Sequence, residues 1–409
     1  MAIAYMILKG ERNMSKSGFY TPHLLVKRTE MQAISTILNT PYNGPHSLQI
    51  AGTQRSKSLF PPIGKFPLIP LFEIPDFYGK ASQITSFVDT RSTLLHNNWK
   101  PTFPAFIDSF HCSRLNKNGN TPIPNSNMKF FTSPALMKDR YFIPVLHSFD
   151  KRTSEYYDVR TVIKNKHASA IAVRLKSDRF NKWSHIISND ADLAKWLYSL
   201  GIKSNTYYLL LDLGQILNYG NSRSVNTQNL YTQILSIINS IQNAQVQTKV
   251  VLLATSVPKS TYISPGLTAI NREEWNRWIG DKRLYSKTNF GDYGTVGIIN
   301  QNNYSGPRNI SAKFTYTSDT RFLIGKNSNL FLSTSNTKTK SHKNALIQVM
   351  NNITKQPDFQ PNHCNIDKWM LNVANGNSTN YKSQTKWIRY STVHHILFVL
   401  MQLKAKKLI

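Results

Sequence analysis

Six apolar runs in the sequence each end in a polar or ionisable residue. The clearest is Lys65-Phe-Pro-Leu-Ile-Pro-Leu-Phe-Glu73, which is followed by Ile74 and Pro75. A run that is apolar on both faces is typical of a fully buried strand, and a proline cannot donate to the ladder, so this strand should end at Glu73. The other five runs end at Asp108, His147, Arg174, Asp212 and Ser256. We therefore expect these side chains to share one site at the C-terminal ends of parallel strands.

The residues that end these runs have the chemistry to act on a phosphate. Carboxylates on neighbouring strands are oxygen ligands suited to Mg²⁺ or Mn²⁺, and we expect such a metal between Glu73, Asp108 and Asp212. Basic side chains nearby would bind phosphate or stabilise developing negative charge. The expected catalytic residues are Glu73, Asp108, His147, Asp212 and Asp292, and the expected ligand- or phosphate-binding residues are Lys27, Arg174, Ser256 and Tyr293. The alternative is that these residues form ordinary ion pairs that cap a packed barrel.

Helical periodicity separates the strand-like runs. Apolar residues recur at helical spacing in Thr29–Leu38, Ala81–Asn97, Thr153–Asn165, Asp190–Leu200 and Leu230–Ile241. A first strand is expected at Tyr20–Lys27, and a further strand and turn at Tyr285–Gly294. About eight strand–helix units of roughly 30 to 45 residues each predict a (β/α)8 TIM-barrel-like fold, whose active site lies at the C-terminal ends of the strands. An open doubly wound sheet is the alternative, but no glycine-rich phosphate turn follows the first strand.

The last part of the chain departs from this alternation. A hairpin is expected around Ser318-Asp319, followed by helices over His342–Thr354 and Ile366–Ala374. We interpret this part as the last barrel helix plus a C-terminal hairpin and helix elaboration of a single domain, residues 18–409. Residues 1–17 are interpreted as an N-terminal extension, with Met14 as an alternative start. Polar loop inserts are expected at about residues 39–64, 111–133 and 327–341.

Lysine and arginine far outnumber the acidic residues. The chain of 409 residues carries 50 Lys+Arg and 21 Asp+Glu, a formal net charge of +29. Such an excess points to a polyanionic partner, most commonly nucleic acid or a nucleotide. No apolar run approaches the about 18 residues that a membrane span needs. Two cysteines argue against a disulfide-stapled secreted protein, so a cytoplasmic location is the default.

Two His-Cys pairs, His111-Cys112 and His363-Cys364, contain ligands of the kind that zinc uses. Their spacing matches no zinc motif, and we interpret them as chance neighbours. The pair His394-His395 precedes an apolar run, which is typical of histidines at the edge of a core. The cofactor expected from the sequence is therefore Mg²⁺ or Mn²⁺, and the sequence points to no other.

A series of short motifs resembles the beta family proteins, a group named after a bacteriophage beta protein. The motifs include Pro70-Leu-Phe-Glu73, Phe106-Ile-Asp108, Leu211-Asp212-Leu-Gly, Gly291-Asp292-Tyr293-Gly294 and His394-His395. They occur in order from residue 20 to about residue 400. Members of this family are commonly encoded by bacteria, phages and mobile elements, so the resemblance implies a role in phage–host conflict. It supplies no catalytic residues to carry over.

Three functions of different classes fit these features, and the weakest is a structural partner in a larger complex. The first is an enzyme that hydrolyses a phosphoester of nucleic acid or a nucleotide with a divalent metal. The second is a non-catalytic barrel that recognises nucleic acid or a phage protein. A metal bound between Glu73, Asp108 and Asp212 would favour the enzyme. The sequence leaves the substrate and the oligomeric state open.

Overall fold

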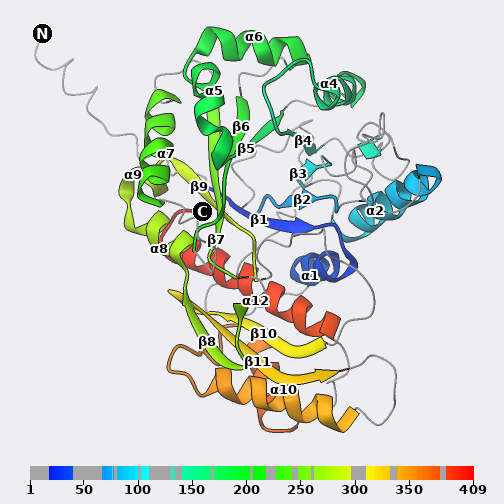
Figure 1. Cartoon of the computed structure of the whole chain (residues 1–409), viewed down its shortest axis with the longest axis vertical. Coiled ribbons are helices and arrows are strands. Elements are labelled where there is room, and N and C mark those ends of the chain that lie inside the picture. The colour runs from blue at the N-terminus through cyan, green and yellow to red at the C-terminus, as the bar shows by residue number, and fades with distance from the viewer. Residues whose placement is uncertain are drawn as a thin grey trace, which may run out of the picture.

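Eight parallel strands close into a barrel in the computed structural model (Figure 1). The structure describes residues 18–39, 67–75, 77, 81–99, 103–109, 130–131, 133, 141–166, 170–202, 206–217, 227–241, 247–258, 262–295, 310–331, 339–377 and 384–409. The barrel strands are β1 (Tyr20–Leu25), β2 (Leu71–Glu73), β3 (Ala105–Asp108), β4 (Phe142–Leu146), β5 (Ala172–Lys176), β6 (Thr206–Gln215), β7 (Gln247–Thr255) and β9 (Thr288–Asp292). They are hydrogen-bonded in this order, and β9 pairs with β1. The predicted (β/α)8 barrel is confirmed, and the open doubly wound sheet is excluded because the sheet closes.

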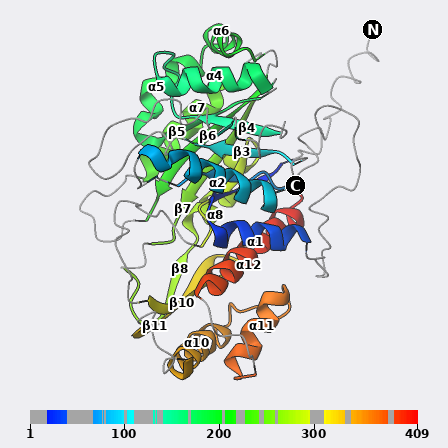
Figure 2. The ribbon, with the colours of Figure 1, turned by 90° about the vertical axis from the view of Figure 1, so that its right-hand side faces the viewer.

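Helices surround the barrel, five of them at the positions that the periodicity indicates (Figure 2). They are α1 (Arg28–Asn39), α2 (Ile84–Asn98) after a 3-10 turn η3 (Ala81–Gln83), α4 (Ser154–Lys166), α5 (Phe180–Ile187) after η5 (Ser177–Arg179), α6 (Asp190–Leu200), α7 (Thr227–Ile241), α8 (Glu273–Gly280) and α9 (Lys282–Tyr285). Their ends follow local chemistry. The Asn189 side chain accepts hydrogen bonds at the start of α6, and Gly201 ends that helix with a left-handed φ of 89°.

Side chains of alternating residues fill the barrel, because successive residues of a strand point to opposite faces. The lower layers are apolar, and the rings of Phe106 and Tyr208 pack edge to face there, with centroids 5.0 Å apart. Tyr208 and Leu210 on β6 point inward, so Asp212, at the next inward position, closes the interior with a carboxylate. Gly291 on β9 leaves room for its neighbours, since a Cβ there would lie 2.9 Å from the carbonyl oxygen of Thr21. The polar rim thus sits on a dry core.

A second sheet lies beyond one side of the barrel. It contains β8 (Gly266–Asn271), β10 (Ile310–Thr317) and β11 (Arg321–Phe331), antiparallel in the order β10-β11-β8. The helix α12 (Gln384–Ala405) runs between this sheet and the barrel, packing on α1 and β10, and α10 (Thr339–Thr354) and α11 (Asn365–Ala374) lie on the far side of the sheet (Figures 1 and 2). This arrangement puts α12 in contact with both parts.

Three sequence expectations differ from the structure or fall outside it. The hairpin around Ser318-Asp319 is present, but the third strand, β8, was not expected because its six residues include only three aliphatic side chains. The insert expected at 327–341 is shorter, since β11 continues to Phe331 and α10 begins at Thr339. The insert at about 39–64, nearly all of that at 111–133 and the pair His111-Cys112 fall outside the described residues. No helix of the described part has the length and apolar character to cross a membrane.

Candidate functional site

Arg174 on β5 is the centre of a buried ionic network at the C-terminal end of the barrel. Its Nη1 lies 2.6 Å from Glu73 Oε2 and 2.6 Å from Asp108 Oδ2, and it donates to both. Its Nε donates to Asp212 Oδ2 at 2.9 Å, and its Nη2 donates to the hydroxyl of Tyr293 at 3.0 Å. Side chains from three other strands and from the end of β9 thus converge on one guanidinium, and Arg174 is only 3% exposed.

Two histidines extend this network on either side. The Nε2 of His23 lies 2.7 Å from Glu73 Oε2, and the Nε2 of His147 lies 2.9 Å from both carboxylate oxygens of Asp108. Each histidine is thereby held by a carboxylate that itself contacts Arg174. We call the whole set, His23, Glu73, Asp108, His147, Arg174, Asp212 and Tyr293, the rim network.

The charges of the rim network stabilise one another. Burial alone would raise the pKa of Asp108, but His147 and Arg174 outweigh it and hold that pKa well below its usual range. Burial opposes the charge of Arg174, but Tyr293 and the carboxylates keep its pKa well above the usual value. Burial and the Asp212 carboxylate raise the pKa of Tyr293 well above its usual value, so its phenol keeps the proton that it donates to Asp212 Oδ1 at 2.5 Å. Asp108 and Arg174 therefore carry opposite charges throughout the physiological range.

A guanidinium stands where the sequence suggested a divalent metal. Glu73, Asp108 and Asp212 do come together, as expected, but they converge on Arg174. Its N–H groups face four internal acceptors, namely the three carboxylates and the Tyr293 hydroxyl. A metal between the three carboxylates would have to displace Arg174, and Mg²⁺ or Mn²⁺ binding there stays a prediction.

A match to a known protein family covers most residues of this site. A family model described as Beta protein matches residues 64–401. This chain belongs to the Beta protein family. The match includes every residue of the rim network except His23, and it includes the second sheet and nearly all of α12. No curated protein matches the chain.

Asp292 lies in a different cluster of this Beta protein family member. Its Oδ1 accepts from the Tyr20 hydroxyl at 2.8 Å, and its Oδ2 lies 2.9 Å from Nε2 of His395 on α12. Burial raises the pKa of Asp292, but His395 and Tyr20 outweigh it and leave the pKa below its usual value. The Nδ1 of His395 lies 2.9 Å from the Thr317 hydroxyl at the end of β10. Both His394 and His395 are completely buried, so the interpretation as core-edge histidines understated their contacts.

Ser256 and Lys27, expected to bind phosphate, have other surroundings. The Ser256 hydroxyl donates to the Glu274 carboxylate and accepts from the backbone N–H of Glu273 at 2.9 Å, so it caps the start of α8. Lys27 follows β1 and is half-buried, and its charge opposes the burial that raises the pKa of Glu30 to about 7. Phosphate binding by these two residues stays a prediction.

Sequence reasoning missed His23 as a member of the rim network. The strand Tyr20–Leu25 carries Thr21 and His23 among apolar residues, so no apolar run ends at His23. The signal that could have found it is the alternation of side chains along the strand. Phe19 faces the barrel interior, so Thr21 and His23 should face it too. Applied to β1, this alternation would have selected His23.

A basic surface hollow of about 500 Å³ is lined by residues that begin at Phe149, two positions after His147 in the sequence. The loop between β4 and α4 contributes Lys151 and Arg152, and α5 and α6 contribute Lys182, Trp183 and Lys195. Lys182 Nζ lies 5.0 Å from the centre of the Trp183 ring. The hollow combines cations with an aromatic side chain, which is the combination that nucleic-acid backbones and bases contact.

Proposed function

We propose that this protein cleaves a phosphodiester by acid–base catalysis, with His23 and His147 as the proton-transferring pair. One observation carries the proposal: two histidine–carboxylate pairs flank a single buried guanidinium at the end of a barrel where such folds place their active sites. In each pair the carboxylate orients the imidazole through Nε2. Through the other ring nitrogen, one histidine would take a proton from the water that attacks phosphorus, and the other would give a proton to the oxygen that leaves as the P–O bond breaks.

The charge of the rim network gives this proposal a pH dependence. Three carboxylates face one guanidinium, a net charge of −2 when both histidines are neutral. Protonation of one histidine lowers the charge of the network to −1 and so weakens its repulsion of an anionic phosphate, whereas proton abstraction needs the other histidine neutral. Activity should rise and then fall with pH, as expected for an acid and a base that act together.

The charge of the chain and the basic hollow formed by the β4–α4 loop, α5 and α6 support nucleic acid as the substrate class. The net charge of +29 attracts polyanions, and Lys151, Arg152, Lys182 and Lys195 outnumber the two acidic residues of the hollow, Asp150 and Asp192. Binding of this kind should weaken steeply with salt, because each phosphate contact releases counterions. Fluorescence anisotropy with single-stranded DNA and RNA at low and high salt measures it.

The decisive experiment compares histidine variants in the presence of a chelator. Hydrolysis of bis(p-nitrophenyl) phosphate and of labelled single-stranded DNA and RNA would be followed across pH for the wild type, His23→Asn and His147→Asn, with His96→Asn on α2 as the matched control. We expect each rim variant to lose about 100-fold or more, and the control to match the wild type. Activity that requires Mn²⁺ would instead support metal catalysis by Glu73, Asp108 and Asp212.

The competing proposal is a non-catalytic barrel that recognises nucleic acid or a phage protein. The internal pairing of Arg174 favours it, because a guanidinium engaged by three carboxylates is also what a purely structural network looks like. Salt-sensitive nucleic-acid binding without any hydrolysis, unchanged in His23→Asn and His147→Asn, would decide for it. The role in phage–host conflict that the family resemblance implies stays a prediction.

A further inference from the structure

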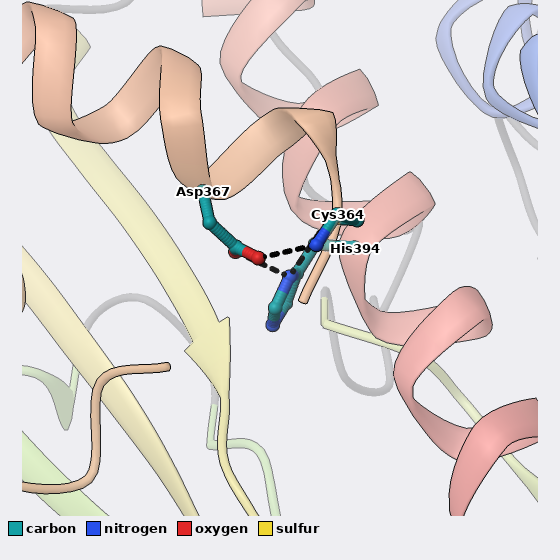
Figure 3. A group of neighbouring side chains, drawn as sticks. All are labelled: Cys364, Asp367 and His394. Carbon is teal, nitrogen blue, oxygen red and sulfur yellow. Dashed lines mark hydrogen bonds and ion pairs between the residues drawn. The ribbon is translucent and has the colours of Figure 1, made fainter. Parts of the chain in front are cut away.

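Three potential metal ligands meet where the start of α11 reaches α12 (Figure 3). They are Cys364, Asp367 and His394, which we call the α11–α12 cluster, and their exposed fractions are 9%, 0% and 0%. One ligand atom from each lies within 4.8 Å of the others. No other group of three such ligands converges in this way within the described part of the chain.

The separations match those of ligands around one small cation. His394 Nδ1 lies 3.5 Å from Cys364 Sγ and 3.1 Å from Asp367 Oδ1. With zinc bonds of about 2.3 Å to sulfur and about 2.1 Å to nitrogen and oxygen, tetrahedral geometry gives separations of about 3.6 Å and about 3.4 Å. The cluster therefore needs little movement to hold an ion.

The hydrogen bonds around the cluster fix which atoms face that ion. His394 Nε2 lies 2.9 Å from the carbonyl oxygen of Thr317, which can only accept, so Nε2 carries the hydrogen and Nδ1 carries the lone pair of the neutral ring. A ligand histidine is usually oriented by such a bond from its other nitrogen. Asp367 Oδ2 accepts the backbone N–H of Cys364 at 2.6 Å, while the buried Oδ1 faces Nδ1 of His394 at 3.1 Å.

The same geometry argues against a catalytic cysteine. In a nucleophilic relay the thiol and the carboxylate occupy different nitrogens of the histidine. Here both face Nδ1, and a backbone carbonyl occupies Nε2. A single proton on Nδ1 cannot serve both acceptors well, whereas a metal ion can bind all three atoms at once.

We propose that Cys364, Asp367 and His394 bind a zinc ion that joins α11 to α12. A thiolate, an imidazole and a carboxylate form a mixed ligand set that suits zinc better than Mg²⁺ or Ca²⁺, which select oxygen. The fourth ligand is a water or His363, whose ring centre lies 6.0 Å from that of His394. Zinc at this buried position is structural, and it is independent of the chemistry at the rim network.

The test begins with the wild-type chain carrying no histidine tag. Protein purified without chelators should contain one zinc per chain by elemental analysis. After chelation, titration with Co²⁺ should give the near-ultraviolet band of a cobalt–thiolate bond and the intense visible bands of a tetrahedral site, saturating at one equivalent. A wild-type protein that binds no zinc and gives no thiolate band overturns the proposal, whatever any variant does.

Matched variants then assign the ligands. Cys364→Ser should abolish the thiolate band, and Asp367→Asn should weaken Co²⁺ binding about 100-fold or more. Cys112→Ser, at the other cysteine of the chain, should leave both unchanged. A thiolate band that survives Cys364→Ser and disappears in Cys112→Ser would place the metal elsewhere and overturn the assignment. If Cys364→Ser does not fold, the Cys112→Ser spectrum still decides which thiol binds.

Discussion

Two buried groups of charges in this protein solve the same electrostatic problem in different ways. The rim network gathers three carboxylates around a covalently attached cation, Arg174, and its Asp108 is completely buried. The α11–α12 cluster gathers a carboxylate and a thiol around one imidazole. The thiol and the carboxylate both face Nδ1 of His394, where a small cation could contact all three ligand atoms. A site that contains its own guanidinium has little need of a metal, whereas a site with only a histidine gains from one.

Removing the internal cation of the rim network should have the largest effect. In Arg174→Met the carboxylates of Glu73, Asp108 and Asp212 stay buried without their partner, and we expect the free energy of unfolding to fall by about 3–5 kcal/mol. Urea denaturation measures it. The control is Arg152→Met, whose side chain is 89% exposed beside Asp150 and should leave the stability close to that of the wild type. Equal effects in the two variants would mean that the rim does not depend on its cation.

Metal addition should stabilise the chelator-treated protein only through the α11–α12 cluster. At a free zinc concentration 100 times the dissociation constant, the free energy of unfolding should rise by about 2.7 kcal/mol. Cys364→Ser should lose this gain, and Mg²⁺ should produce none in the wild type. Thermal melts with each metal measure the difference. A stabilisation by Mg²⁺ that disappears in Asp212→Asn would restore the metal site at the rim.

Glu30, a buried carboxyl near the rim network, should make the free energy of unfolding depend on pH. Burial raises its pKa from 4.5 to about 7, with Lys27 opposing and Glu73 adding to the shift. Because the folded pKa is raised, its contribution to stability is complete below pH 4.5 and is lost as the pH rises through about 7. Relative to the wild type, Glu30→Gln should therefore gain about 2 kcal/mol between pH 5 and pH 8. A constant difference across that range in urea titrations would show that Glu30 is ionised when folded.

The smallest expected effect belongs to the phenol that bridges two members of the rim network. Tyr293→Phe removes the hydroxyl that donates to Asp212 and accepts from Arg174. Asp212 Oδ1 keeps the backbone N–H of Gly214 at 3.0 Å, so we expect a loss of about 1–2 kcal/mol. A loss as large as that of Arg174→Met would show that the phenol, and not the guanidinium, organises the network. Denaturation of the two variants side by side provides the comparison.

Sequence patterns predicted most of the barrel, because most of its strands are short apolar runs that can be recognised locally. Glu73, Asp108, Arg174 and Asp212 ended apolar runs, and parallel strands place such ends at one rim, so their meeting followed from local reasoning. Two features of the rim network could not be predicted in this way, because they depend on the strand register and on contacts between residues far apart in the sequence. His23 lay inside a run, and the role of Arg174 as the shared cation depends on contacts from β5 to three other strands, of which only β6 is its neighbour.

The α11–α12 cluster could not be predicted from the sequence for another reason. Cys364 was noticed beside His363, but its ligand partners are Asp367, one helical turn later, and His394, on the next helix. Cysteine, aspartate and histidine at such spacings match no recognised motif. Only the packing of α11 on α12 brings them together, and that packing depends on β10 through the Thr317 carbonyl.

The contact between Tyr20 and His395 has a consequence for how the chain is made. The Tyr20 hydroxyl lies 3.2 Å from His395 Nε2, 375 residues later, and β1 is completed only by pairing with β9. At about 5–20 residues per second, a ribosome needs about 20–75 s to synthesise the chain between these two residues. Until β9 is made, 272 residues after Tyr20, one edge of β1 has no partner strand, and such edges are where nascent chains pair wrongly. The seam between β1 and β9 is thus the last part of the barrel to form, and the part where a chaperone would have most to protect.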